Sequence, residues 1–194
     1  MIEIYSKNIQ GVWFSVACAR QQIVASSFAT SQQGALSSIL GNLPVNVPFE
    51  IFHEPSTFAE DTLAFLKIIY DGRNIDTTFP LALKRLPTYT QRVLKATSQI
   101  PLGYVTSYGS IAKATGGGPR AVGSVMASNP FAPIIPCHRV VKSDFTLGGY
   151  GGGLRVKLEL LKREKRGFSK SKEVAVNGNT LQVFPVEYSL GPFG

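Results

Sequence analysis

The sequence predicts an α/β (α+β) protein, in which a small antiparallel β-sheet with helices precedes a mainly helical domain. Two runs of β-branched and aromatic residues near the N-terminus indicate the sheet, and apolar residues at helical spacing recur further along. The charge divides as well: residues 1–86 hold six Lys or Arg against seven Asp or Glu, whereas residues 87–194 hold fourteen against five. We therefore expect an N-terminal domain with its linker over 1–86, a second domain over 87–170 and a tail over 171–194.

The first part begins with a hairpin and continues with two helices. Residues 11–19 and 22–29 are strand-forming runs separated only by two residues, which is typical of paired strands. Thr30-Ser31 then predicts the start of a helix that stops at Gly41-Asn42. A second helix is expected over residues 56–70, with Ser56 as its N-cap.

The second part is expected to carry a helix-turn-helix. A helix from about Thr88 ends before Pro101, and a short strand follows over 104–106. Ser107 can cap the next helix, and glycines at 116–118 turn the chain into a further helix over 119–128. Two short helices joined by a glycine turn predict this motif, although an ordinary pair of packed helices has the same pattern.

The basic surplus of the second part favours a polyanionic partner, because each phosphate that a protein neutralises releases condensed counterions. A solvated basic face would account for the same surplus. The helix over 119–128 offers Arg120 as its long hydrogen-bonding side chain and otherwise small residues, including Ala121, Gly123 and Ser124. Such a helix suits shape-based contact in a minor groove, with Arg120 as a single inserted side chain.

The segment Ile135–Val140 contains the candidate reaction centre, because Cys137 and His138 are adjacent there. A thiol is a strong nucleophile only as the thiolate, which a nearby imidazole can generate. On an extended chain, however, consecutive side chains point to opposite faces. Proton transfer from Cys137 to His138 therefore requires a sharp turn or a bridging water.

Three further segments follow the candidate centre. Residues 147–154 form a glycine-rich stretch that predicts a mobile loop over a bound base, with Tyr150 as its stacking member, or a plain flexible linker. Residues 154–164 predict an amphipathic helix. Asn177-Gly178 in the tail is the signature of a tight hairpin.

Three motifs in order resemble the O6-alkylguanine-DNA alkyltransferases: R-A-V-G-x-x-M-x-x-N-P over 120–130, P-C-H-R-V over 136–140 and G-x-Y-x-G-G-L over 148–154. The match covers residues 88–167. The resemblance implies a ribonuclease H-like first domain and a winged helix-turn-helix-like second domain. It also implies direct repair of DNA, in which the alkyl group of O6-alkylguanine, and of O4-alkylthymine, passes irreversibly and stoichiometrically to Cys137.

The same resemblance implies roles for individual residues. His138 would take the thiol proton of Cys137 through a water, and Glu164 would hold His138 in the useful tautomer. Tyr108 would donate to a ring nitrogen of the departing base, and Asn129 would brace the turn before the nucleophile. The implied contacts with DNA and with the flipped base are Arg120, Tyr108, Ala121, Gly123, Ser124, Arg139, Val140, Tyr150 and Gly151.

The remaining expectations concern partners and location. The partner is double-stranded DNA that contains O6-alkylguanine, and no membrane is involved. We expect no cofactor and no metal, because two cysteines and two histidines cannot form a four-ligand zinc site without carboxylates. A monomer in the cytoplasm, or in the nucleus of a eukaryote, is expected. The alternatives are a protein that binds alkyl lesions without reacting and a helix-turn-helix regulator.

Overall fold

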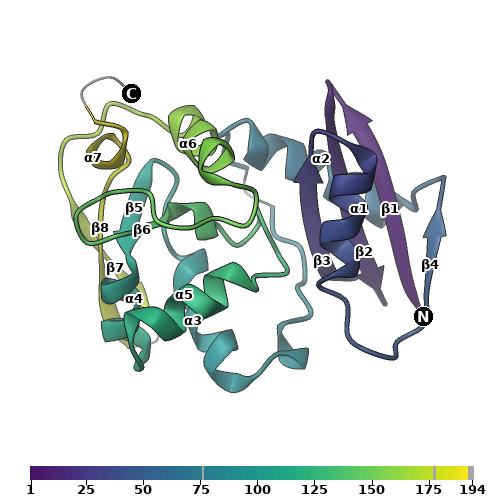
Figure 1. Cartoon of the computed structure of the whole chain (residues 1–194), viewed down its shortest axis with the longest axis horizontal. Helices are drawn as coiled ribbons and strands as arrows, with labels where there is room; N and C mark the ends of the chain where they lie inside the picture. The colour runs from purple at the N-terminus through teal and green to yellow at the C-terminus, as the bar shows by residue number, and fades with distance from the viewer. Residues whose placement is uncertain (76, 177, 192–194) are drawn as a thin grey trace. The chain divides into compact units, whose positions relative to one another are not determined.

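The computed structural model describes residues 1–75, 77–176 and 178–191, and its fold is mixed α/β with two four-stranded sheets (Figure 1). Contacts divide the chain into two compact units. Unit 1 contains Met1–Tyr70, Asn74–Leu83 and Pro130–Ile134. Unit 2 contains Asp71–Arg73, Lys84–Asn129 and the chain from Ile135 onward.

The sheet of unit 1 has the strand order β3-β2-β1-β4. β1 (Ile2–Ile9), β2 (Val12–Ala19) and β3 (Gln22–Ala29) form an antiparallel meander, whereas β4 (Phe49–Phe52) pairs parallel to β1. The sheet is therefore mixed rather than purely antiparallel, and the hairpin over 11–29 is one part of it. Arg20 and Gln21 both have positive φ, the conformation that a two-residue hairpin turn needs.

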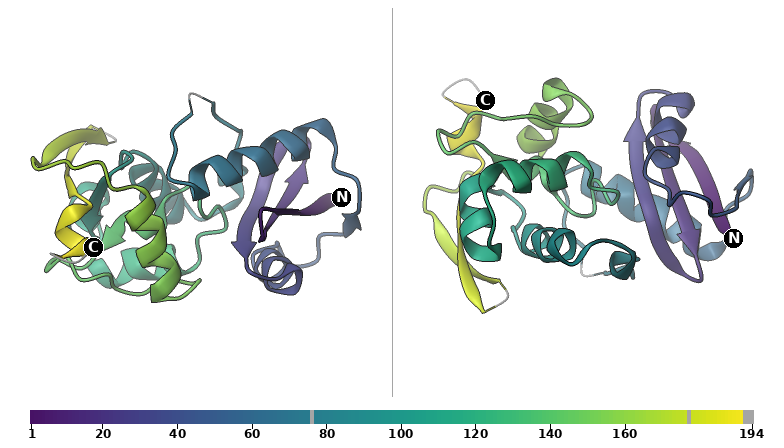
Figure 2. Two further views of the ribbon diagram at one scale, coloured as in Figure 1. Left: turned by 90° about the horizontal axis from the view of Figure 1, so that it is seen from above. Right: turned by 60° about the horizontal axis from the view of Figure 1, so that its bottom comes forward.

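Two helices cover the two faces of this sheet (Figure 2). α1 (Gln32–Leu40) begins after Ser31, whose side chain accepts from the Gly34 amide, and it packs on β2 and β3. α2 (Thr57–Tyr70) packs on β1 and β2. Because both faces are covered, the middle of β2 is buried without alternation. The predicted helix starts at Ser31 and Ser56 agree with these elements.

Residues Pro130–Ile134 also pack in unit 1, although they follow α5 in the sequence. The Ser26 amide donates to the Pro130 carbonyl at 2.8 Å, and the Ser26 hydroxyl donates to the Ala132 carbonyl at 2.9 Å. Phe131 is fully buried there. The chain thus leaves unit 2 just after Asn129 and returns to it two residues before Cys137.

Unit 2 has a sheet of order β6-β5-β8-β7, surrounded by helices (Figure 1). β5 pairs parallel to β6 and antiparallel to β8, which also pairs antiparallel to β7. The elements in chain order are η1 (Leu83–Arg85), α3 (Thr88–Ser98), β5 (Tyr104–Ser107), α4 (Tyr108–Thr115), α5 (Pro119–Ala127), η2 (Cys137–Arg139), β6 (Val140–Val141), α6 (Leu154–Arg163), β7 (Lys172–Val176), β8 (Asn179–Pro185) and α7 (Glu187–Leu190).

The tail is an integral part of unit 2 rather than a separate segment. Leu181, Val183 and Val186 are fully buried, and the Val186 amide donates to the Gly103 carbonyl at 2.9 Å. The Thr106 hydroxyl donates to the Gln182 carbonyl at 2.7 Å. Strands β7 and β8 form the predicted hairpin, although Asn177 of its turn lies outside the described residues.

Helices α4 and α5 pack against each other and are joined by the glycines at 116–118. The Ser107 hydroxyl accepts from the Ser110 amide at 3.0 Å, which caps α4 as predicted. Pro119 occupies the first turn of α5, where its missing N–H costs nothing. In the described part of the chain, no helix combines the length and the apolar character that crossing a membrane requires.

Candidate active site

Cys137 lies on a tight turn, not on extended chain. The 3₁₀ helix η2 is closed by the Cys137 amide donating to the Ile135 carbonyl at 2.8 Å and by the Arg139 amide donating to the Pro136 carbonyl at 2.9 Å. Both Cys137 and His138 are buried on this turn, with the thiol 5% exposed. The sharp turn that proton transfer requires is therefore present.

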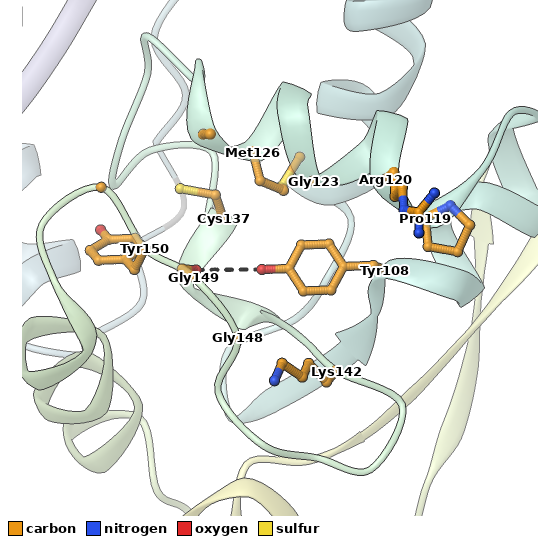
Figure 3. Close-up of a pocket in the computed structure, with 12 residues that line it drawn as sticks. Tyr108, Pro119, Arg120, Gly123, Met126, Cys137, Lys142, Gly148, Gly149 and Tyr150 are labelled. Atoms are coloured by element: carbon orange, nitrogen blue, oxygen red, sulfur yellow. Dashed lines mark hydrogen bonds between the residues drawn. The ribbon is translucent and has the colours of Figure 1, made fainter.

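The thiol faces a pocket of about 540 Å³. Figure 3 shows Cys137 between α5 and the glycine-rich loop, with Tyr108 and Tyr150 on either side. This volume falls within the usual range of small-molecule sites. The lining residues come from α4, α5, η2, the position just after β6 and the loop: Tyr108, Pro119, Arg120, Gly123, Met126, Ala127, Cys137, Lys142, Gly148, Gly149, Tyr150 and Gly151.

Glu164, the C-cap of α6, joins His138 and Arg139 in one buried cluster. Its Oε1 lies 2.8 Å from His138 Nε2. The Arg139 guanidinium donates to both carboxylate oxygens, Nε at 2.8 Å and Nη2 at 2.9 Å, and its Nη1 donates to the Ile100 carbonyl at 2.6 Å. Two parallel bonds from a guanidinium fix a carboxylate in orientation as well as in charge.

The charge of Glu164 fixes the tautomer of His138. Burial alone would raise the pKa of Glu164, but His138 and Arg139 together lower it to about 2. The carboxylate is thus an acceptor only, so that Nε2 of His138 carries a proton. Burial lowers the pKa of His138, although Glu164 acts in the opposite direction. The imidazole is therefore neutral, and its Nδ1, buried and without a hydrogen-bond partner among the described residues, carries a free lone pair.

Cys137 is held as a thiol until something takes its proton. Burial raises the pKa of Cys137, whereas a hydrogen bond from Asn129 and the charge of Lys157 lower it. Asn129 also donates from Nδ2 to the Ile135 carbonyl at 2.9 Å and so braces the turn before η2. The sequence places Asn129 in this bracing role, and the geometry brings it there.

Tyr108 and Tyr150 both face the pocket as protonated phenols. Burial raises the pKa of each, so neither ionises near neutral pH. The Tyr108 hydroxyl donates to the Gly149 carbonyl at 3.4 Å, a long bond that a better acceptor can displace (Figure 3).

Helix α5 presents small residues beside the pocket. Val122, Val125 and Met126 are buried beneath it, while Ala121 and Ser124 are exposed. A side chain built on Gly123 would meet no atom within 4 Å, so this face leaves room for a ligand. Arg120 is exposed in the first turn of α5, where it borders the pocket.

Residues 88–166 match the family model described as 6-O-methylguanine DNA methyltransferase, DNA binding domain. The matched segment contains the reactive cysteine candidate, the His138–Glu164 pair and the whole pocket. Over these residues the chain is similar to the 6-O-methylguanine DNA methyltransferases. Its order of motifs agrees with the resemblance seen in the sequence.

Members of this methyltransferase family from archaea resemble the chain in sequence. A methylated-DNA–protein-cysteine methyltransferase of Pyrobaculum aerophilum is 60% identical over 65 residues, which are 34% of this chain and 44% of the relative. That of Methanothermobacter thermautotrophicus is 36% identical over 111 residues, 57% of this chain and 63% of the relative. The aligned region thus spans less than two thirds of these relatives.

Solved structures in the family extend the likeness to most of the chain. O6-methylguanine-DNA methyltransferase of Pyrococcus kodakaraensis matches with a TM-score of 0.67 and 25% identity, over 84% of this chain and 99% of the other. Mycobacterium tuberculosis OGT, solved in complex with DNA, matches with a TM-score of 0.68 and 28% identity, over 84% of this chain and 92% of the other.

Several features of the site were not anticipated from the sequence. Arg139, expected to contact DNA, instead directs its guanidinium to Glu164 and Ile100 and is not among the lining residues. Lys142 and Lys157 were not singled out at all. Lys142 borders the pocket, and Lys157 is fully buried behind the loop. Within residues 1–191, apart from 76 and 177, no three His, Cys, Asp or Glu side chains gather as a metal ion would require.

Proposed function

We propose that this protein repairs alkylated double-stranded DNA by moving the alkyl group of O6-alkylguanine, and of O4-alkylthymine, to Cys137. One observation carries the proposal: a buried thiol faces a base-sized pocket, and the adjacent imidazole has a free Nδ1 lone pair. A buried thiol at the base of a pocket can reach the alkyl group only after the base has left the helical stack, so the damaged nucleotide would be flipped out.

The chemistry is a displacement at carbon. The thiol proton of Cys137 passes through a water to Nδ1 of His138, and the resulting imidazolium is stabilised by Glu164. The sulfur then forms a bond to the alkyl carbon as the bond from that carbon to O6 breaks. The electron pair of the broken bond stays with guanine, and the Tyr108 hydroxyl donates a hydrogen bond to a ring nitrogen of the departing base, which stabilises the developing negative charge.

The base would be held mainly by the backbone. The carbonyls of Cys137 and Val140 would accept from the exocyclic amine, since each carbonyl oxygen can accept a second hydrogen bond. Gly151 would face the alkylated oxygen, and Tyr150 would stack on the ring. Arg139 acts in this proposal through Glu164, whose orientation it fixes, and not as a contact with DNA.

DNA would be bound through α4 and α5, in a winged helix-turn-helix arrangement in which β7 and β8 form the wing. Ala121, Gly123 and Ser124 would approach the minor groove, and Arg120 would fill the gap left by the flipped base. The similar Mycobacterium tuberculosis OGT was solved in complex with DNA, which supports DNA as the partner. Unit 1 would be a ribonuclease H-like domain, and the protein would act as a monomer where the cell keeps its DNA, in the cytoplasm or a nucleus.

A thioether does not revert, so each molecule would react once. Duplex DNA with a methyl-labelled O6-methylguanine tests the proposal directly. We expect one label per protein molecule, recovered on the peptide that contains Cys137. Cys137→Ala should abolish transfer and keep DNA binding, and Cys18→Ser, a change at the other cysteine, should transfer normally.

The alternatives give different outcomes in the same experiment. A protein that only binds lesions would retain the modified duplex with the label still on DNA. A regulator would prefer a particular sequence whether or not it is alkylated. Either result at stoichiometric protein would overturn the proposed transfer.

A further inference from the structure

Lys157 is a fully buried lysine on α6 that the transfer reaction described above does not use. Its ammonium donates to three backbone carbonyls: Val140 at 2.6 Å, Gly149 at 3.3 Å and Leu147 at a short distance. A lysine has three N–H donors, so these bonds satisfy it completely.

The three carbonyls belong to two segments, the strand that follows the Cys137 turn and the glycine-rich loop, and Gly149 of the loop lines the pocket. Val140 directly follows the turn that carries Cys137, whereas Leu147 and Gly149 flank Gly148 in the glycine-rich loop. The Gly149 carbonyl also accepts from the Tyr108 hydroxyl, and the ammonium lies 5.9 Å from the centre of the Tyr108 ring. A single charged group thus connects the nucleophile's turn, the loop and the tyrosine.

A buried ammonium without a carboxylate partner is an unfavourable way to stabilise a fold. Lys157 makes no ion pair with any carboxylate of the described residues, and burial lowers its pKa to about 8, although Cys137 acts in the opposite direction. Burying a charge opposes folding, and an apolar side chain of similar volume at such a site is often neutral or stabilising. The position therefore indicates a role that an apolar residue cannot fill.

We propose that Lys157 is a positioning residue that holds the glycine-rich loop against the pocket, so that the loop backbone meets the flipped base in register with Cys137. The inference rests on the proposed function. Five glycines between residues 148 and 153 leave the loop with little side-chain packing of its own, so its position depends on external bonds. The ammonium provides two of them, to Leu147 and Gly149, and its third bond ties the same group to Val140 beside the Cys137 turn.

The test compares Lys157→Met, which removes every donor, with Lys157→Gln, which keeps an N–H donor on a shorter neutral side chain. Hydrogen–deuterium exchange reports on residues 147–153, and the reaction of Cys137 with free O6-benzylguanine separates apparent binding from the maximal rate. We expect faster exchange of the loop and a loss on the order of 10²-fold in second-order rate for Met, mostly in apparent binding. Gln should be intermediate.

Two controls separate positioning from general stabilisation. Lys162→Met, on the exposed side of the same helix, should change neither the exchange nor the rate. The melting temperature of Lys157→Met should equal or exceed that of the wild type. Iodoacetamide, which needs no base pocket, should still modify Cys137 in every variant.

Two results would overturn the inference. In the first, Lys157→Met leaves the hydrogen exchange of the loop and the apparent binding unchanged. In the second, the loss of rate in Lys157→Met is accompanied by a lower melting temperature, and Lys157→Gln restores neither. Failure of the proposed function has another signature. The wild type would then be inert toward both O6-benzylguanine and the alkylated duplex, while the exchange experiment would still report whether Lys157 holds the loop.

Discussion

Glu164 is a buried carboxylate that bonds one cation, Arg139, and one neutral imidazole, His138. It is 1% exposed, and its partners use both oxygens: His138 Nε2 on one and Arg139 on both. The desolvation of the carboxylate is offset by its bonds with His138 and Arg139, and the guanidinium is held in turn by the Ile100 carbonyl. The tautomer of His138 is thus set by a carboxylate that also pairs with Arg139, the next residue along the chain.

Removing the charge of Glu164 should change how stability depends on pH. Its folded pKa of about 2 lies below the unfolded value of roughly 4.3. The pair therefore contributes stability that is fully present above pH ~4.3 and is lost as the pH falls toward about 2. Glu164→Gln should lose about 3–5 kcal/mol at neutral pH, because it leaves the buried charge of Arg139 without a partner.

Urea unfolding between pH 7 and pH 2 measures this effect. The wild type should lose stability through the acid range more steeply than Glu164→Gln, so that the two curves converge. Glu159→Gln, an exposed carboxylate on the same helix, should follow the wild type. Parallel curves for Glu164→Gln and the wild type would contradict the assigned pKa.

At the scale of elements, the sequence predicted those features that depend only on neighbouring residues, such as the starts of helices. Ser31, Ser56 and Ser107 were predicted as helix starts, and each accepts a backbone amide hydrogen bond of the helix that follows. The parallel pairing of β4 with β1 and the passage of 130–134 into unit 1 depend on contacts between distant segments, which no local pattern encodes. The motifs predicted Cys137 and its neighbours, whereas no pattern in the sequence singled out Lys157, because its burial depends on how the loop folds over it.

The glycine-rich loop contains a matched pair that tests its conformation. Gly148 has a φ of +67°, and a Cβ there would lie 3.0 Å from Tyr108 Cε2, whereas a Cβ on Gly149 would meet no atom within 4 Å. Gly148→Ala should destabilise the loop by about 1–3 kcal/mol and displace Tyr108, so transfer to Cys137 should slow. Gly149→Ala should react within a factor of a few of the wild type. Equal rates for the two variants, measured with the alkylated duplex, would show that the described loop conformation is not the reactive one.

At the scale of the whole molecule, the tail completes the sheet of unit 2 and part of its buried core. Strand β8 pairs with β5, the strand that leads into α4, so the sheet beside α4 is completed by residues beyond the family match. Val186 packs with Val105, Val141 and Leu161 in one buried cluster, which joins the tail to β5, β6 and α6. The stability of the site should therefore depend on residues that contain none of its motifs.

Substitutions at two neighbouring residues of β8, one buried and one exposed, test whether the tail stabilises unit 2. Leu181 is fully buried, whereas Gln182 is exposed. Leu181→Ala should lower the free energy of unfolding by about 2–5 kcal/mol through lost burial and the cavity it leaves, and Gln182→Ala should stay within about 0.5 kcal/mol of the wild type.

The measurement has to report on unit 2. Trp13, the single tryptophan, lies in unit 1, so unfolding should be followed by hydrogen exchange of unit 2 amides and not by fluorescence. A stable Leu181→Ala variant with unchanged exchange at β5 would show that unit 2 folds without its tail, and the site would then depend on residues 84–167 alone.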